Sequence, residues 1–118
     1  MIQQTSLENP KVQLIAKHVS QAAQQVLGSR LRQVILFGSY ARGDYDHESD
    51  IDFLVLADID NDGIVFARRA IQQSLGTLGL ELDILISFVV DKADRYDEFV
   101  HALPFYANVK NEGIPLYA

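Results

Sequence analysis

The sequence predicts one α/β domain in which a small mixed sheet is flanked by helices. Three short apolar segments have the length of buried strands, and segments with apolar residues at helical spacing lie before, between and after them. The 118 residues, 48% of them apolar, are enough to bury one core, so we expect a single domain over residues 1–118. This alternation of elements is typical of an α/β sandwich.

The first helix is predicted over residues 10–27. Asn9 is a suitable N-cap, Pro10 suits the first helical position, and Gly28 marks the end of the pattern. The apolar residues recur at helical spacing and would face the core: Val12, Ile15, Val19, Ala22, Ala23 and Val26.

Three strands are predicted, at residues 34–37, 51–56 and 82–87. Residues 57–81 are long enough to form a helical crossover, so we expect the second and third strands to run parallel. An antiparallel first strand would make the sheet mixed. The apolar residues of the crossover helix recur until glycines interrupt the pattern: Ile64, Ala67, Ala70, Ile71, Leu75 and Leu78, with Gly76 and Gly79 as breaks.

A last helical region is predicted from about Lys92, with Asp91 as its cap. Pro104 interrupts this region, because a proline inside a helix removes a hydrogen bond and clashes with the preceding turn. A final turn ends near Gly113, and the residues after it are expected to form a tail.

Polar residues from separate segments are expected at one edge of the sheet. Asp50 and Asp52 lie at the start of the second strand, and Asp83 lies at the start of the third. Parallel strands begin at the same edge, and an antiparallel first strand would end there with Gly38 and Ser39. The predicted topology therefore brings these residues together.

Asp50 and Asp52 are two residues apart on a strand, so their side chains share one face. Carboxylates at the mouth of an apolar strand repel one another and lose hydration, so they tend to protonate unless a cation lies between them. Magnesium prefers one or two carboxylates with waters and phosphate oxygens. A second ion, about 3.5–4 Å from the first, would activate the attacking oxygen, with Asp83 as third ligand or proton acceptor. Glu81 shares the face of Asp83 and is the alternative third acid.

A phosphate site is predicted beside these acids. Gly38 lets the backbone approach phosphate oxygens, and Ser39 adds a hydroxyl group and amides at the start of a helical turn. Arg42 lies three residues further on, where it would reach the leaving phosphates. The alternative for Arg42 is a surface ion pair with Asp44 or Asp46.

The composition disfavours several other functions. Sixteen acidic and ten basic residues give a net charge of −6, which disfavours binding to nucleic-acid backbones. The absence of cysteine excludes disulfides and zinc–thiolate sites, and so favours hard cations. No apolar run is long enough to cross a bilayer, and the N-terminus lacks the features of a secretory signal. We therefore expect a cytoplasmic protein with no membrane partner.

The spacing of the polar residues resembles that of a known superfamily. The GS pair at residues 38–39, ten intervening residues and the DID triplet at residues 50–52 reproduce the G-S-x10-D-x-D signature of the DNA polymerase beta-like nucleotidyltransferases. The surrounding GSYARGDYDHESDIDFLV resembles their short prokaryotic branch, the minimal nucleotidyltransferases, and Asp83 stands where the family has its third carboxylate. The ending NEGIPLYA is also similar. The helix predicted over residues 10–27 looks like an addition, which would serve as a partner or dimer surface.

The resemblance implies transfer of AMP from ATP with two magnesium ions. By similarity, Gly38 and Ser39 would hold the triphosphate, Asp50 and Asp52 the metals, and Asp83 would act as base or metal ligand. Minimal nucleotidyltransferases are commonly paired with a helical HEPN ribonuclease toxin, and as antitoxins they adenylylate a tyrosine of that toxin. This implies a hetero-oligomer or a homodimer.

Two alternative functions are left open. One is a binding module that neutralises its partner by contact without catalysis. The other is a small-molecule nucleotidyltransferase of the aminoglycoside-modifying type, although such an enzyme would usually need an added acceptor domain, for which 118 residues leave no room.

Overall fold

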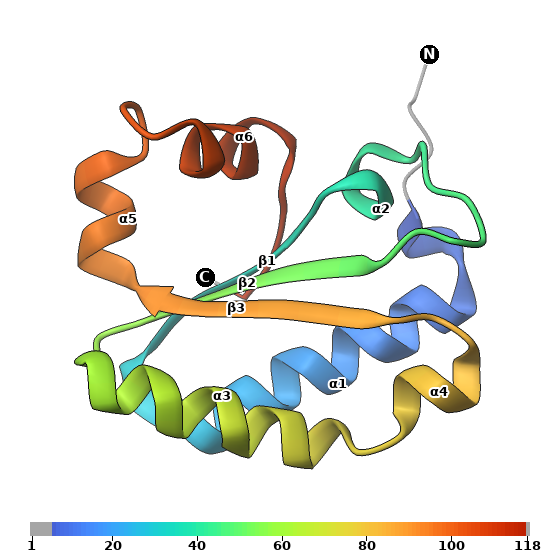
Figure 1. Cartoon of the computed structure of the whole chain (residues 1–118), viewed down its shortest axis with the longest axis horizontal. Coiled ribbons are helices and arrows are strands. Elements are labelled where there is room, and N and C mark those ends of the chain that lie inside the picture. Colours follow the sequence, from blue (N-terminus) through green and yellow to red (C-terminus); the bar gives the residue numbers. More distant parts are fainter. Residues whose placement is uncertain (1–5, 118) are drawn as a thin grey trace.

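A four-stranded sheet forms the centre of the computed structural model, which describes residues 6–117 (Figure 1). The strands are β1 (Leu31–Phe37), β2 (Ile51–Ala57), β3 (Ile86–Lys92) and β4 (Ile114–Tyr117), in the order β3-β2-β1-β4. β1 pairs antiparallel with both β2 and β4, whereas β2 and β3 run parallel. The predicted mixed α/β sheet is confirmed, with one strand more than expected.

Helices cover both faces of this sheet. α1, α3 and α4 lie on one face, and α5 and α6 lie on the other (Figure 1). None of the described helices is long and apolar enough to cross a lipid bilayer. Residues 1–5, in which we expect no secretory signal, and Ala118 lie outside the described residues. The helix bounds are α1 Pro10–Leu27, α2 Ser39–Arg42, α3 Asn61–Leu75, α4 Leu78–Leu82, α5 Ala93–Phe99 and α6 Pro104–Glu112, with short 3-10 turns at Ser6–Glu8 and Gly28–Arg30.

The prediction for α1 is confirmed at both ends. The Asn9 side chain accepts a hydrogen bond from the backbone N–H of Lys11 at 2.9 Å, and Pro10 occupies the first turn. The helix ends before Gly28, whose N–H donates to the carbonyl of Gln24. Its apolar face packs on the sheet and on α3.

The predicted crossover between β2 and β3 contains two helices. α3 begins after Asp60, whose side chain accepts a hydrogen bond from the N–H of Gly63 at 2.8 Å. The chain then breaks at Gly76 and forms the short α4. This connection returns the chain to the edge where β2 begins, so β3 runs parallel to β2.

The third strand lies further along the chain than predicted. We expected it at residues 82–87, but Leu82 ends α4 and β3 begins at Ile86. β3 pairs with β2 residue for residue, from Ile51 opposite Ile86 to Ala57 opposite Lys92. The apolar run after Leu82 is longer than one strand, and its second half fills the pairing sites of β2. Asp91 therefore belongs to β3 and is not the predicted helix cap.

The C-terminal residues form a strand where we expected a tail. α6 begins at Pro104 and ends at Glu112, and β4 then pairs with β1 at the edge of the sheet. Pro115 faces Ile35 in this pair. A proline has no backbone N–H to donate to a neighbouring strand, so its presence suits an edge position.

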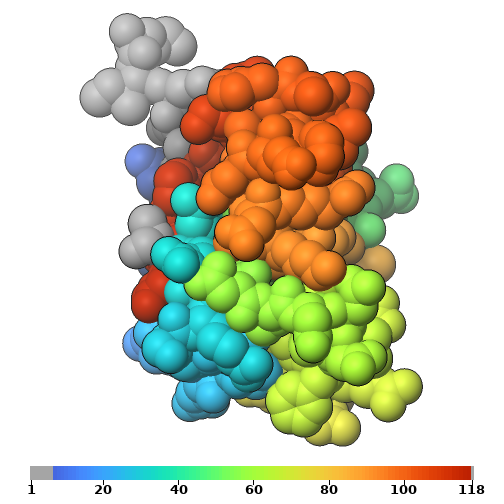
Figure 2. Space-filling view, turned by 90° about the vertical axis from the view of Figure 1, so that its left-hand side faces the viewer, coloured from blue at the N-terminus to red at the C-terminus, as the bar shows by residue number. Residues whose placement is uncertain are grey.

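The two faces of the sheet pack into separate cores. Val34, Leu36, Ile51, Phe53 and Val55 face α1 and α3, whereas Ile35, Leu54 and Leu56 face α5 and α6. Asp52 lies between Ile51 and Phe53, and neighbouring side chains on a strand point to opposite faces. The Asp52 side chain is therefore on the α5/α6 face, at the beginning of β2. Figure 2 shows the end of the molecule that lies opposite the beginning of β2. There α5 (orange) lies above the start of α3 (yellow-green) and the start of β1 (cyan).

Candidate active site

The bend after β1 lies directly against the start of β2. Phe37 pairs with Asp52, and the chain then turns at Gly38, which has φ +80°. A Cβ atom at Gly38 would lie 2.6 Å from Oδ2 of Asp52. Both the positive φ and this close approach require glycine. The structure therefore brings together the predicted bend and one of the predicted acids.

Asp50 and Asp52 form an acidic pair whose negative charge is offset only in part, by Arg42. Asp52 is half-buried and Asp50 is exposed. Burial raises the pKa of Asp52, the negative charge of Asp50 raises it further, and the positive charge of Arg42 lowers it. Within residues 6–117, no group donates a hydrogen bond to the Asp52 carboxylate. A divalent cation would compensate both carboxylates, so this pair fits the donor set that magnesium prefers.

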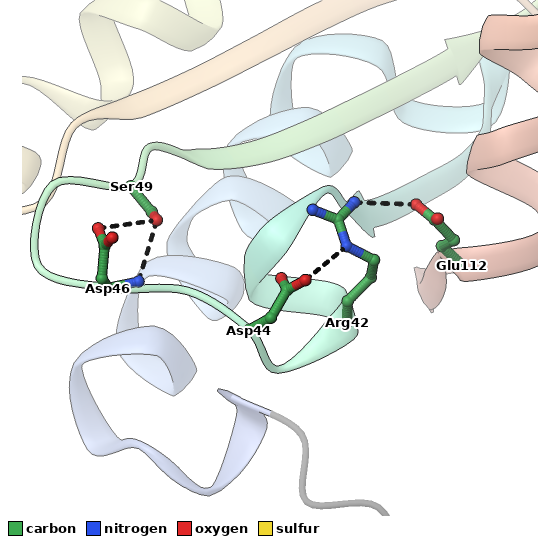
Figure 3. Close-up of polar contacts among 5 residues, drawn as sticks. All are labelled: Arg42, Asp44, Asp46, Ser49 and Glu112. Carbon is green, nitrogen blue, oxygen red and sulfur yellow. Dashed lines mark hydrogen bonds and ion pairs between the residues drawn. The ribbon is translucent and has the colours of Figure 1, made fainter.

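The loop that leads to Asp50 is held by its own polar groups (Figure 3). The backbone N–H of Asp46 donates to Ser49 Oγ at 3.0 Å, and Ser49 Oγ donates to Asp46 Oδ1 at 3.3 Å. The rings of Tyr40 and Tyr45 stack with centroids 4.2 Å apart. Of these four residues we considered only Asp46, as a partner of Arg42, and we did not foresee the others as part of the site. The i, i+3 spacing of Asp46 and Ser49 is the sequence pattern that would have indicated such a turn.

Arg42 makes the surface contacts that we considered as the alternative to phosphate binding. Its Nε donates to Asp44 at 3.2 Å, and its Nη1 donates to Glu112 at 3.1 Å (Figure 3). Asp46, the other predicted partner, bonds to Ser49 instead. Glu112 was not predicted because it is distant in sequence. Arg42 still lies close enough to influence Asp52 electrostatically.

Asp83 does not occupy its predicted place at the start of the third strand. It ends α4 in the left-handed conformation, with φ 58° and ψ 39°, and its side chain is exposed. Glu81, the alternative third acid, is also exposed and accepts a hydrogen bond from Thr77 Oγ1 at 3.1 Å. No group of three or more His, Asp or Glu side chains in residues 6–117 is close enough to hold a metal ion. The described residues thus bring Asp50 and Asp52 together without a third acid beside them, and the role of Asp50, Asp52 and Asp83 as metal ligands stays a prediction.

A cavity of about 660 Å³ lies between Asp83 and Asp50, the first acid of this pair. It lies between the loop before β2, the end of α3, α4 and the chain leading into β3, and Asp50 and Asp83 both line it. The remaining lining residues are His47, Glu48, Ser49, Gln72, Leu75, Gly76, Thr77, Gly79, Leu80, Ile84, Leu85 and Ile86.

Comparisons with known proteins identify the class to which this fold and site belong. Residues 15–111 match the family model of the nucleotidyltransferase domain, and the chain belongs to this family. The match includes the Gly38 bend, the acidic pair and the cavity. It begins inside α1, so α1 is largely part of the family domain, and our expectation that this helix is an addition is corrected.

Individual relatives agree with this assignment. The chain is 36% identical over 88 residues to a Methanocaldococcus jannaschii protein named as a putative protein adenylyltransferase, and the alignment covers 75% of this chain and 80% of that protein.

Solved structures support the fold. A crystal structure of a putative nucleotidyltransferase from Sulfolobus solfataricus has a TM-score of 0.60 and 19% identity, covering 99% of this chain and 91% of that one. A crystal structure described as the toxin-antitoxin with AMP-PNP has a TM-score of 0.52 and 21% identity, covering 87% of this chain and 73% of that one.

Proposed function

We propose that this chain transfers AMP from ATP to a hydroxyl group of a protein partner. The observation that carries the proposal is the close approach of the Gly38 bend to Asp52, beside a pair of acids whose charges only Arg42 is seen to offset in part. Membership of the nucleotidyltransferase family and 36% identity to a protein named as an adenylyltransferase support it.

We assign phosphate binding and metal binding to different residues of the site. Gly38 and Ser39 would bind the phosphates of ATP through backbone N–H groups and the serine hydroxyl. Asp50 and Asp52 would hold magnesium, which when bound offsets the charge of the triphosphate and of the leaving pyrophosphate. Arg42 would contact the leaving phosphates if it exchanged its partners Asp44 and Glu112.

The transfer itself is an in-line displacement at the α-phosphorus. The acceptor oxygen forms a bond to this phosphorus while the bond to the bridging oxygen of the β-phosphate breaks, and pyrophosphate leaves with the electron pair. The acceptor hydroxyl loses its proton to a carboxylate. We assign this role to Asp83, because it lines the cavity that reaches Asp50.

We further propose that the acceptor is a tyrosine of a helical HEPN-type toxin, which would make this chain an antitoxin. The family resemblance supports this assignment, and so does the fold shared with the structure described as the toxin-antitoxin with AMP-PNP. The test is to incubate the chain with ATP, magnesium and the helical protein encoded beside it, and to measure the mass of that protein. We expect one added AMP on a tyrosine. An unchanged mass would contradict the proposal.

One observation favours a second candidate, an antitoxin that acts by contact alone. Asp83 is not assembled with Asp50 and Asp52 into one ligand cluster. The variant Asp52→Asn separates the two candidates in a toxin-neutralisation assay. Full neutralisation by this variant would support contact inhibition, and loss of neutralisation would support adenylyl transfer.

A further inference from the structure

We propose that the cavity between the loop before β2, the end of α3 and α4 is the acceptor subsite of this enzyme. It would receive a tyrosine side chain from a partner segment with basic and apolar neighbours. This inference rests on the proposed adenylyl transfer and adds the place and chemistry of acceptor recognition.

The position of the cavity suits the direction of attack. Along the sheet edge, the Gly38 bend at the end of β1 is followed by the acidic pair at the start of β2 and then by the cavity beside the start of β3. In an in-line displacement the nucleophile enters opposite the leaving group. If the phosphates that leave are bound at Gly38, the acceptor enters from the β3 side. Asp50 belongs to both the acidic pair and the cavity wall.

The apolar part of the lining favours an aromatic acceptor. Leu80 and Leu85 line the cavity with 83% and 67% of their surfaces exposed, and Leu75, Ile84 and Ile86 lie deeper. Large apolar side chains exposed together at a polar site mark an interaction surface. A tyrosine ring would cover them while its hydroxyl group reaches the acids, whereas the short side chain of serine would leave them in water.

The charged part of the lining favours basic neighbours of that tyrosine. Glu48, Asp50 and Asp83 line the cavity together with one histidine, and neither lysine nor arginine is among its lining residues. Partner residues with positive charge would therefore be attracted, and acidic ones repelled. A volume of about 660 Å³ is in the range of sites that hold a ligand larger than one side chain.

The wall formed by α4 is fixed in place. The N–H of Ile84 donates to the carbonyl of Gly79 at 2.9 Å. A Cβ atom at Gly79 would lie 2.6 Å from the carbonyl oxygen of Ile84, so only glycine permits this close packing. The cavity is therefore shaped by the local fold.

The test compares the exposed cavity leucines with an exposed phenylalanine elsewhere. The variants are Leu80→Ser, Leu85→Ser and their double variant, and the control is Phe66→Ser, which changes a side chain that is 64% exposed on α3 and does not line the cavity. The probes are three short peptides: tyrosine flanked by leucine and arginine, the same peptide with glutamate in place of arginine, and the arginine peptide with serine in place of tyrosine. AMP attachment is followed by mass spectrometry, and the Kd of ATP is measured with magnesium.

We expect the double variant to lower kcat/KM for the arginine–tyrosine peptide at least about tenfold while the Kd of ATP changes less than about twofold. The control Phe66→Ser should match the wild type. The wild type should modify the glutamate and serine peptides at least about tenfold more slowly than the arginine–tyrosine peptide. Unchanged transfer in the double variant would overturn the inference. Equal loss of ATP binding would also overturn it, because the cavity would then hold the nucleoside.

The outcome also separates this inference from the proposed function. If the wild type releases AMP from ATP but modifies neither tyrosine peptide, the cavity does not recognise a local acceptor segment, and this inference alone is wrong. If the wild type neither binds ATP with magnesium nor releases AMP, the proposed function fails and this inference fails with it.

Discussion

Two aspartates on the same face of the sheet, at opposite ends, have contrasting surroundings. Asp91, near the end of β3, accepts hydrogen bonds from the Tyr106 hydroxyl group and from the N–H of Lys92, and Tyr106 in turn accepts one from Arg95 Nε at 3.0 Å. Asp52, at the start of β2, has no hydrogen-bond donor among residues 6–117, and the negative charge of Asp50 outweighs the positive charge of Arg42 in its effect on the Asp52 pKa.

This difference distinguishes an aspartate that stabilises the fold from one that is available to bind a ligand. At the Asp91 end, every partner is supplied by the fold. The network links β3, α5 and α6, and the Tyr106 ring also contacts the Tyr96 ring edge to face. At the Asp52 end, the fold leaves an electrostatic cost that a bound cation would remove. An acid that the fold satisfies is structural, and one that it leaves only partly compensated is a candidate for ligand binding.

The largest expected effect is on catalysis by the acidic pair. Asp50→Asn and Asp52→Asn should each lower AMP transfer by about a thousandfold or more, because each removes a ligand of the magnesium that offsets several kcal/mol of transition-state charge. Asp91→Asn is the matched control and should retain transfer. The measurement is the initial rate of AMP attachment to the partner protein. Comparable rates in Asp52→Asn and Asp91→Asn would remove the proposed distinction between the two ends.

The next largest effect is expected at Asp83, the exposed acid in the cavity wall. Asp83→Asn should lower transfer by about a hundredfold, a typical contribution of a general base, with unchanged thermal stability. Asparagine is the right substitution, because it tolerates the left-handed conformation at this position as well as aspartate does. Asp83→Ala would remove the carboxylate and also strain the left-handed backbone, so the loss of the base could not be told apart from the strain. Full activity of Asp83→Asn would show that residue 83 serves only the turn.

The network at the other end should determine stability. Asp91→Asn and Tyr106→Phe should each lower the free energy of unfolding by about 1–3 kcal/mol, because each leaves a polar partner without its hydrogen bond. Urea denaturation of these variants and of Asp52→Asn compares their free energies of unfolding. If Asp52→Asn proved the more destabilised, Asp52 would be the structural acid.

The smallest expected effect is a pH dependence. Burial and Asp50 raise the pKa of Asp52 in the folded protein. The unfolded chain therefore loses this proton first, and the folded state loses stability as pH rises from about 3.9, the ordinary aspartate value, through the higher folded value. In EDTA, Asp52→Asn should match the wild-type Tm below this window and exceed it at pH 7. A lower Tm at pH 7 would contradict the assignment.

Local patterns in the sequence predict much of this fold. The bounds of α1 follow from Asn9, Pro10 and Gly28, because capping depends on residues near each helix end. The parallel pairing of β2 and β3 follows from the length of the connection between them. The bend at Gly38 and the acids of β2 are brought together by that topology.

Features that depend on distant pairing were not predictable in this way. The apolar run after Asp83 is compatible with several strand positions, and only its register with β2 selects Ile86 as the start. β4 exists because β1 offers an edge, and the Arg42–Glu112 contact joins residues far apart in sequence. Asp91 has the spacing of a helix cap, but the Tyr106 hydroxyl group gives it a structural role.

The most direct test of the account is the binding of ATP by isothermal titration calorimetry, with magnesium and with EDTA. The wild type should bind ATP with a Kd at least about tenfold lower in magnesium than in EDTA, and Asp52→Asn should lose this difference. The control Asp97→Asn, which removes the same charge from the exposed surface of α5, should retain it. Magnesium-independent binding by the wild type, or an undiminished magnesium effect in Asp52→Asn, would contradict the account.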